Sequence, residues 1–558
     1  MRKHINKIFM GALLAGTAIL ASCGSDYLDT VPTESISDEN AVATTENAYK
    51  TLNGVAKTMT IQQPGSSPST YRQGFCGENA IMRLYENLPS QNYNYNSYAS
   101  GWADIHNQRM HTSRTTIYNH YAWFYYYQII TQANVIINRI DNATGPEADK
   151  KFIKASALTF RAYGYEKLIH YYCPRWQDSN NGAAEGVVLR LDESNGDLAP
   201  STMAEVYTQI YQDLDNAINL FRESGINRKA EQVWIPNINV AHAVYARAAL
   251  YKQDYSKALA EATAAKANYP LMSNDSYKAG FCNPTSEWIW GCYGSSDENN
   301  WYWAYGVQGA CNGYYAAAAN TGAGSIGREL INRIPDGDVR KELFLTESAL
   351  GIDASNPLQV EQTYGIIGYN LNTNPVSYSD SLAHDAAKRY IEAHQIKGLP
   401  KAYESEYYHI DGQLKFWVTD RPGVGYLPLI RTSEMVLIEA EANYFLGNTA
   451  AAQAALVELN ATSGRNPSYT CTKTGQDLFE EIKDYREVEL WGEGFGWSDY
   501  KRWNIPVVRH SFAQGGNAHV SVAVTIQPNE ANNWTWVIPE RETLYNDGYS
   551  ILDENANP

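Results

Sequence analysis

The chain has 558 residues, of which 44% are apolar, so it is too long for one small core and has the composition of a soluble globular protein. Its formal net charge is −17. An acidic surface repels nucleic acid and anionic lipid head groups, so neither is an expected partner. After the N-terminal segment, no apolar run approaches the ~20 residues needed to span a bilayer.

The N-terminus has the order of a lipoprotein signal peptide. Three basic residues precede an apolar run over 8–20, and Leu20-Ala21-Ser22-Cys23 follows. We therefore expect cleavage of residues 1–22 and attachment of lipid, including palmitate, to Cys23. Acyl chains anchor firmly because each buried methylene contributes about 0.8 kcal/mol. The alternative is an ordinary signal peptide with an incidental cysteine. Cleavage removes three basic and no acidic residues from the net charge of −17, which leaves −20.

Residues 23–36 are polar and are predicted to be a tether. Ser37, Asp38 and Glu39 predict the start of a helix that runs to Leu52. Residues 60–114 contain many prolines and glycines and are expected to be irregular. Apolar periodicity then predicts two long helices, from about Thr115 to Ile140 and from Ala148 to Tyr171, separated by Gly145-Pro146. A further amphipathic helix is expected over 202–221.

Two later segments have the rhythm of tetratricopeptide repeats. Residues 239–270 and 434–459 each place small residues at helical spacing on both sides of a short turn. Small residues let the two helices of such a hairpin cross closely. The hairpin over 123–171 is a candidate third unit.

Residues 281–430 differ in character, because they are rich in glycine and aromatic residues. Short strands are expected near 287–290, 414–418 and 520–526. The predicted fold is mainly α, with tetratricopeptide-like helical hairpins, long loop-rich insertions and a few short β-strands. We expect an N-terminal helical part over 37–280 and a C-terminal part with ligand loops over 281–558, joined in one structural unit.

Aromatic residues are unusually frequent, with 42 Tyr and 14 Trp. One group is Tyr93, Tyr95, Tyr98 and Trp102, and a second group lies over 301–315, both interleaved with Asn, Gln, Ser and Gly. Flat rings cover the C–H faces of sugars at low entropic cost, and amides bind the hydroxyl edges. This mixture favours glycan binding, although each single aromatic residue is also explained by packing of a loop against the helices.

No motif in the sequence predicts an enzyme. Glu489 and Glu493 lie four residues apart on one predicted helix face, but they are more simply explained by binding Arg486, Arg502 or backbone amides than as a glycosidase pair. His106 and His111 are five residues apart without an adjacent glutamate, so no metal site or cofactor is expected. Six cysteines follow Cys23. Cys282 and Cys292 are the nearest candidates for a disulfide, and buried free thiols are equally compatible.

The chain resembles the SusD/RagB family of outer-membrane lipoproteins that serve polysaccharide uptake in Bacteroidetes. The resemblance rests on the order of LASC, WFYYYQIITQANVIINRI, ALTFRAYGYEKLIHYYCPRW, ALYKQDYSKALAEA, RTSEMVLIEAEANYFLGNTAAAQAALVELN, REVELWGEGFGWSDYKRW and NNWTWVIPERETLYNDGY. One departure is Phe495, which stands where the family often has Arg after Glu-Gly.

The resemblance implies four tetratricopeptide-like units behind a loop-rich ligand face. It also implies a surface-exposed location on the outer membrane, with a TonB-dependent SusC-like porin as partner and an oligosaccharide as ligand. The family's binding regions correspond here to Tyr95, Tyr98 and Trp102 and to the segment from Trp301 to Tyr315, which includes Trp303 and Tyr314. The segment from Arg431 to Trp503 is expected to be scaffold that contacts no ligand. Two alternatives are peptide capture, as in the RagB branch, and a lid or scaffold for the porin that binds no ligand.

Overall fold

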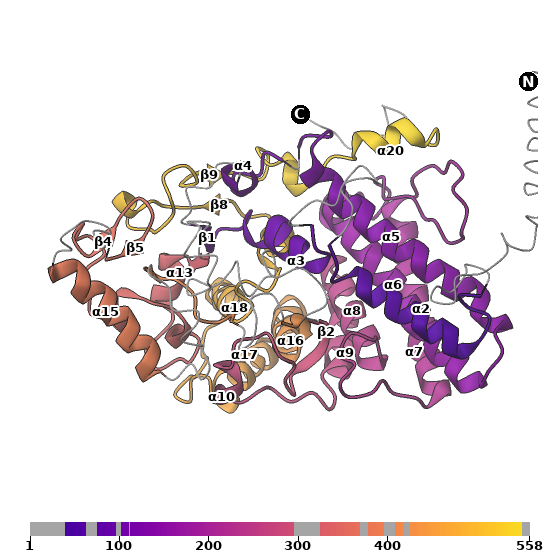
Figure 1. Ribbon diagram of the computed structural model, residues 1–558, viewed down its shortest axis with the longest axis horizontal. Coiled ribbons are helices and arrows are strands. Elements are labelled where there is room, and N and C mark those ends of the chain that lie inside the picture. Colours follow the sequence, from indigo (N-terminus) through magenta and orange to yellow (C-terminus); the bar gives the residue numbers. More distant parts are fainter. Residues whose placement is uncertain are drawn as a thin grey trace, which may run out of the picture.

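The structure, a computed structural model, describes residues 40–62, 75–95, 102–110, 112–294, 324–368, 378–394, 408–417 and 425–549. Helices dominate these residues, and the strands are short, which confirms the mainly α prediction (Figure 1). None of the described helices combines the length and the apolarity needed to span a membrane. The larger helices are α2 (Thr45–Thr58), α5 (Ile117–Arg139), α6 (Glu147–Tyr172), α7 (Met203–Ser224), α8 (Ile238–Tyr251), α9 (Tyr255–Ala265), α15 (Tyr378–Ala393), α16 (Thr432–Phe445), α17 (Thr449–Val457), α18 (Gly475–Glu489) and α19 (Gly496–Trp503).

Helix α2 begins later than predicted. Its N-cap is Thr44, whose hydroxyl accepts a hydrogen bond from the backbone N–H of Asn47, and the helix continues to Thr58. The prediction of a helix from Ser37 to Leu52 was therefore wrong in both bounds. Ala48, Leu52 and Val55 of this helix are buried in the core.

Helices α5 and α6 form the predicted long hairpin. Ile129, Ile130 and Ile136 of α5 are fully buried, and Gly145-Pro146 separate the two helices as predicted. Helix α6 contacts α5, α7 and α8. Because neighbours cover several of its faces, nearly every residue from Ala155 onward is buried. The predicted helix over 202–221 is also confirmed, with Thr202 and Glu205 forming a capping box at the start of α7.

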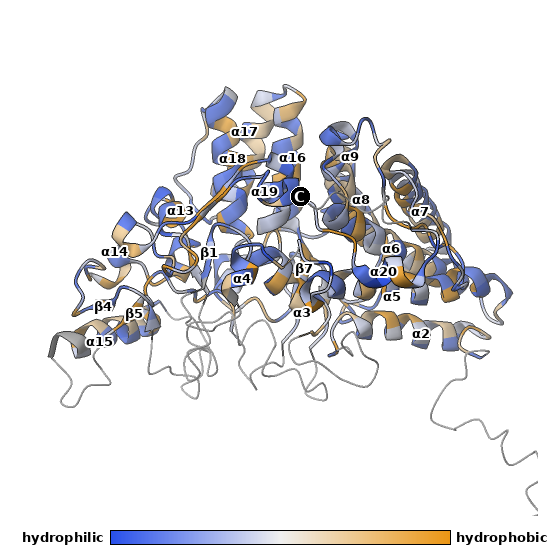
Figure 2. Ribbon diagram, turned by 90° about the horizontal axis from the view of Figure 1, so that it is seen from above, coloured by the Kyte–Doolittle hydropathy of each residue, from blue (hydrophilic) through white to orange (hydrophobic). Residues whose placement is uncertain are grey.

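The two predicted repeat hairpins are confirmed as α8–α9 and α16–α17, and they lie next to each other through contacts between α9 and α16 (Figure 2). Ala246, Ala258 and Ala262 are fully buried, because small side chains let the helices approach closely. The rings of Tyr255 and Phe445 stack with centroids 4.5 Å apart across this contact. The repeat units therefore form one continuous helical framework.

The region 60–114 is more regular than predicted. It contains α3 (Glu78–Ala80), a π-helix over Ile81–Asn87, strand β1 (Tyr93–Tyr95) and α4 (Trp102–His106). All seven residues of the π-helix are buried, so tertiary packing orders a segment whose flanking prolines and glycines indicate a loop.

Within the described residues, the strands form four small sheets, with pairings β1–β3, β2–β7, β4–β5–β6 and β8–β9. Strand β2 confirms the strand predicted near 287–290. Of the strand predicted over 520–526, only the last two residues form a strand, which is β9. The prediction over 414–418 was wrong. Lys415 there is buried and donates to the backbone carbonyls of Glu489 and Trp491, which anchors the segment without strand pairing. The strands are β2 (Trp288–Cys292), β3 (Gly324–Ile326), β4 (Val360–Glu361), β5 (Ile366–Ile367), β6 (Tyr408–His409), β7 (Leu427–Arg431), β8 (Val507–Val508) and β9 (Thr525–Ile526).

A buried network of charges joins distant parts of the chain. Arg431 pairs with Glu287, Glu489 and Glu493, and its side chain is 1% exposed. Arg465 and Arg340 complete the pairing of Glu489. Glu489 and Glu493 bind arginines as predicted, but Arg486 and Arg502 were the wrong arginines. The guanidinium of Arg486 pairs with Asp499, and that of Arg502 pairs with Glu441 and Asp499.

The described cysteines carry free thiols. Cys76, Cys173, Cys282 and Cys292 are buried, and Cys471 is partly exposed. The candidate disulfide between Cys282 and Cys292 is therefore absent from the structure, and the alternative of buried free thiols holds for both. Burial raises the pKa of the Cys282 thiol to about 12, so this thiol is unreactive at neutral pH.

Replacement of Glu166 by Gln is expected to remove a pH dependence of stability. Glu166 is 1% exposed, and neither carboxylate oxygen has a hydrogen-bond partner among the described residues. Burial raises its pKa to about 7 against the opposing effects of Lys167 and Arg247, with Glu434 and Glu86 adding to the rise. The pKa of Glu166 is higher in the folded than in the unfolded chain. The free energy of unfolding therefore falls as pH rises from about 4.5 to about 7, because the unfolded chain releases this proton first.

We therefore expect Glu166→Gln to be more stable than the wild type by roughly 1–3 kcal/mol at about pH 8 and nearly equal at about pH 4. Thermal unfolding at the two pH values measures this difference. Glu540→Gln is the matched control, because Glu540 is exposed at the start of α20 (Glu540–Tyr545). A Glu166→Gln variant with the same pH profile as the wild type would contradict the expectation.

Candidate ligand-binding site

Strand pairing brings together the borders of the two aromatic segments. Strand β1 pairs with β3 in antiparallel register, with Tyr93 opposite Ile326, Asn94 opposite Ser325 and Tyr95 opposite Gly324. Residues 96–101 follow β1 directly, and residues 295–323 end directly before β3. The start of the first aromatic segment (after Tyr95) and the end of the second (before Gly324) therefore lie side by side.

Side chains from the C-terminal part hold β1 in place. The ring of Tyr93 stacks on Trp491 with centroids 4.8 Å apart and planes 15° apart. The indole N–H of Trp491 donates to the backbone carbonyl of Asn92 at 2.6 Å. Both aromatic side chains are buried, so this contact fixes the position of β1 on the scaffold.

A buried amide network holds the β1–β3 pair from the other side. The amide of Asn94 donates to Asn517 at 2.6 Å, and Asn517 donates to the carbonyl of Ile326 at 2.8 Å and to Asp411 at 2.9 Å. Burial raises the pKa of Asp411 to about 6, although Arg328 and Asn517 act to lower it. The network joins both strands to Asp411 and Asn517 and so fixes their position at the base of the site.

The second aromatic segment begins beside another chain segment. It follows Gly294, which lies after β2, and a Cβ at Gly294 would lie 2.4 Å from the carbonyl carbon of Gly425. Gly294 and Gly425 thus meet at a backbone contact that only glycine permits. Strands β2 and β7 pair next to this contact, with Cys292 opposite Leu427.

The predicted site residues lie mostly outside the described residues. The backbones of Tyr95 and Trp102 belong to β1 and α4, and nothing is described of their side chains. The remaining predicted residues are outside the described ranges, namely Cys23, Tyr98, Trp301, Trp303, Tyr314 and Tyr315. Tyr93, which belongs to the first aromatic group, is buried against Trp491 and is therefore part of the scaffold.

The part of the chain that the structure describes contains no cluster of His, Cys, Asp or Glu able to hold a metal ion. His106 is 1% exposed, and burial lowers its pKa well below the usual value, so it is a neutral core residue.

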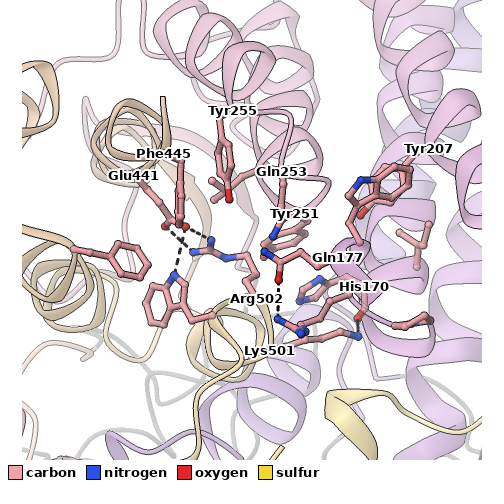
Figure 3. Close-up of a pocket in the computed structure, with 17 residues that line it drawn as sticks. His170, Gln177, Tyr207, Tyr251, Gln253, Tyr255, Glu441, Phe445, Lys501 and Arg502 are labelled. Atoms are coloured by element: carbon pink, nitrogen blue, oxygen red, sulfur yellow. Dashed lines mark hydrogen bonds and ion pairs between the residues drawn. The ribbon is translucent and has the colours of Figure 1, made fainter. Parts of the chain in front are cut away.

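A separate pocket of about 220 Å³ lies among the helix ends and was not predicted (Figure 3). Two Arg-Trp pairs line it, Arg175-Trp176 after α6 and Arg502-Trp503 at the end of α19. This recurrence of Arg-Trp at or just after a helix end is a sequence signal that points to the pocket. Part of its lining comes from the segment Arg431–Trp503, which was expected to contact no ligand.

Comparison with known proteins agrees with this architecture. Residues 73–251 match a family model described as "Starch-binding associating with outer membrane", and residues 420–550 match the model of the SusD family. Together the two matches cover more than half of the chain. No curated protein sequence matches closely enough to count as a relative.

Solved structures with a similar fold come from several Bacteroides species. A SusD-like carbohydrate binding protein from Bacteroides vulgatus has a TM-score of 0.68 at 22% identity, with 92% of this chain and 98% of that chain covered. A SusD superfamily protein from Bacteroides thetaiotaomicron gives 0.64 at 19% identity, with 92% and 100% covered. One from Bacteroides fragilis gives 0.61 at 16% identity, with 91% and 99% covered.

The helical hairpins and the small sheets define a helical-repeat protein. Within that class, the chain belongs to the SusD/RagB family.

Proposed function

We propose that this chain is a cell-surface lipoprotein that captures glycans and delivers oligosaccharides to a TonB-dependent SusC-like porin. The binding face would be made by Tyr95, Tyr98 and Trp102 together with Trp301, Trp303, Tyr314 and Tyr315. Lipid on Cys23 would hold the protein at the outer membrane, and the polar residues 24–36 would give the binding face its reach.

The pairing of β1 with β3 carries this proposal. It makes Tyr95 the neighbour of Gly324, so two aromatic segments separated by about 200 residues in the sequence share one border. A glycan of several sugar rings needs several stacking surfaces within reach of one another, since each ring contributes modestly. The acidic charge of the chain is compatible with a neutral ligand.

Family membership supports the same function. Proteins of this family are binding proteins of the outer membrane, and the family description names starch. A structural neighbour from Bacteroides vulgatus bears the name of a carbohydrate-binding protein. The ligand of this chain need not be starch, because the segments that differ between members would determine which glycan is bound.

Affinity electrophoresis of the mature chain against a panel of neutral and acidic polysaccharides tests the proposal. We expect retardation by at least one neutral glycan and co-purification of a large porin from the native membrane. If no polysaccharide retards the protein and no porin co-purifies, the proposal is wrong. Peptides eluting with the purified complex, without glycan binding, would support peptide capture instead.

The variant Gly324→Val is expected to weaken glycan binding by disturbing β1. A Cβ at Gly324 would lie 2.5 Å from the hydroxyl oxygen of Tyr93. The larger side chain would displace this ring from Trp491 and lower the free energy of unfolding by about 1–3 kcal/mol. Titration calorimetry and thermal unfolding measure the two effects on one sample.

Gly54→Ala is the matched control for this variant. Nothing lies within 4 Å of a Cβ at Gly54 in α2, and removing glycine from a helix stabilises it by up to about 1 kcal/mol. We expect its glycan affinity to be unchanged. Full glycan affinity in Gly324→Val would show that the β1–β3 border does not position the binding segments.

A further inference from the structure

Two aromatic rings stack where a smaller hydrophobic core meets the rest of the molecule. The smaller core contains side chains of β4, β5, β6 and α15 and is separate from the main one. Tyr364, in the turn between β4 and β5, stacks on His519, in the connection between β8 and β9, with centroids 5.3 Å and planes 18° apart. Strands β8 and β9 contribute Val507 and Ile526 to the main core. The stack therefore lies at a boundary between two cores, and ligand sites are frequent at such boundaries.

Hydrogen bonds fix the turn that carries Tyr364. The carboxylate of Glu361 accepts from the backbone N–H groups of Thr363 at 3.1 Å and of Tyr364 at 2.5 Å. His409 of β6 donates from Nδ1 to the backbone carbonyl of Tyr364 at 3.2 Å. The backbone of the turn is therefore held in place on both sides of the ring. A ring that is already ordered loses little entropy when a ligand binds.

His519 presents an unused N–H group to solvent. Its Nδ1 accepts from the backbone N–H of Ser521 at 3.2 Å and lies 2.7 Å from the hydroxyl of the same residue. Burial lowers the pKa of His519, although Glu361 acts to raise it, so the imidazole is neutral at pH 7 and carries its proton on Nε2. Nε2 has no hydrogen-bond partner among the described residues, and it is not buried. This N–H can therefore donate to a ligand that arrives from solvent.

Apolar and polar groups lie side by side on the surface around His519. Val520 is 65% exposed, and the side chains of Tyr364 and His519 are partly exposed. A sugar ring offers C–H faces to such apolar groups and hydroxyl oxygens to an N–H donor. The carboxylate of Glu361 lies close enough to affect the pKa of His519, and a negative charge at that distance disfavours an acidic sugar. The surface therefore suits a neutral sugar ring.

The stack lies beside the end of the first aromatic segment. Figure 1 shows α4 next to β9, and the side-chain amide of Asn107, just after α4, donates to the backbone carbonyl of Ser521 at 3.0 Å. Trp102, one of the proposed glycan residues, begins α4. At 1.5 Å per residue its backbone lies about 8 Å from that of Asn107 along the helix. A glycan chain on the first aromatic segment can therefore continue past α4 to His519.

We propose that Tyr364 and His519 form a further subsite of the glycan site, which takes one neutral sugar ring of a chain that continues from the first aromatic segment. His519 donates from Nε2 to a hydroxyl of that ring, Val520 contacts its C–H face, and Tyr364 holds the imidazole in place. This subsite presupposes the proposed glycan function and adds to it a dependence on chain length, because a short oligosaccharide bound at the aromatic segments does not reach His519.

Isothermal titration of the mature chain tests this subsite. The probes are trisaccharide and hexasaccharide fractions of the polysaccharide that retards the chain most, from a panel of amylopectin, xylan, mannan, galactan and levan. We expect the hexasaccharide to bind the wild type more tightly than the trisaccharide does. His519→Phe keeps a ring for the stack and removes the N–H donor, so the Kd of the hexasaccharide should rise about three- to tenfold. The Kd of the trisaccharide should change by less than about twofold.

His394→Phe is the matched control. His394 also stacks on a tyrosine, Tyr390, with centroids 3.9 Å apart, but it follows α15. We expect this variant to bind both fractions as the wild type does. Thermal unfolding of the same samples should give similar midpoints for the wild type and both variants, because each phenylalanine keeps the stack.

Three results would overturn the subsite. These are unchanged hexasaccharide affinity in His519→Phe, an equal rise in the Kd of both fractions, and a hexasaccharide that the wild type binds no more tightly than the trisaccharide. If Trp102→Ala loses binding while His519→Phe binds as the wild type does, only the subsite is wrong and the proposed glycan function stands. If no polysaccharide of the panel retards the wild type, both are wrong.

Discussion

Replacement of Arg431 by Met is expected to lower the free energy of unfolding by about 3–5 kcal/mol, because it leaves buried carboxylates without their shared cation. Arg431 binds Glu493 at 2.7 and 2.8 Å, Glu287 at 2.5 Å and Glu489 at 3.2 Å. Burial alone would raise the pKa of Glu489, but Arg465 and Arg431 outweigh it and lower that pKa. Thermal and urea unfolding of the purified variant measure the loss.

The matched control is Arg109→Met. Arg109 pairs with Asp104 at 3.2 Å, but the two side chains are 71% and 43% exposed. Solvent screens such a pair, so we expect a change within about 0.5 kcal/mol. Equal stability of Arg431→Met and the wild type would contradict the assignment of this network as a major contributor to the stability of the fold.

The double variant Trp301→Ala/Trp303→Ala is expected to weaken polysaccharide binding by about thirtyfold or more. Central aromatic residues dominate binding surfaces, and loss of one such residue costs about 2 kcal/mol or more. Because both positions belong to the segment that returns at β3, the helical framework should be unaffected. Affinity electrophoresis measures the binding, and thermal unfolding of the same samples checks the framework.

Tyr545→Ala controls for the loss of an exposed aromatic side chain elsewhere on the molecule. Tyr545 lies in α20 and is 81% exposed. We expect it to migrate as the wild type does in every gel. Unchanged migration of the Trp301/Trp303 variant would show that the second aromatic segment does not bind the glycan.

Local patterns predicted the helical framework well. The period of Ile129, Ile130, Ala133 and Ile136 fixed the inward face of α5, and the glycine between α16 and α17 marked the turn. The charge network could not be predicted, because Glu287 lies 144 residues from Arg431 along the chain. A local sequence pattern cannot identify an ion-pair partner so far away in the chain. The same limit explains why Arg486 and Arg502 were wrongly paired with Glu489 and Glu493.

The candidate site was predictable in composition but not in arrangement. The aromatic content of residues 93–102 and 301–315 indicated ligand binding, whereas the contact between their borders needed the pairing of Tyr95 with Gly324. The pocket at Tyr251 was missed because its lining comes from several helices, each of which reads as scaffold by itself. A short segment at a helix end, such as Pro174 to Trp176, carries little periodicity to interpret.

We propose that the two aromatic segments bordered by the β1–β3 pair bind one glycan together. Isothermal titration of the wild type, Trp102→Ala and Trp301→Ala with the glycan that binds best tests it most directly. We expect each tryptophan variant to bind at least about tenfold more weakly, since each removes a ring from the same proposed surface. Wild-type affinity in both variants would contradict it.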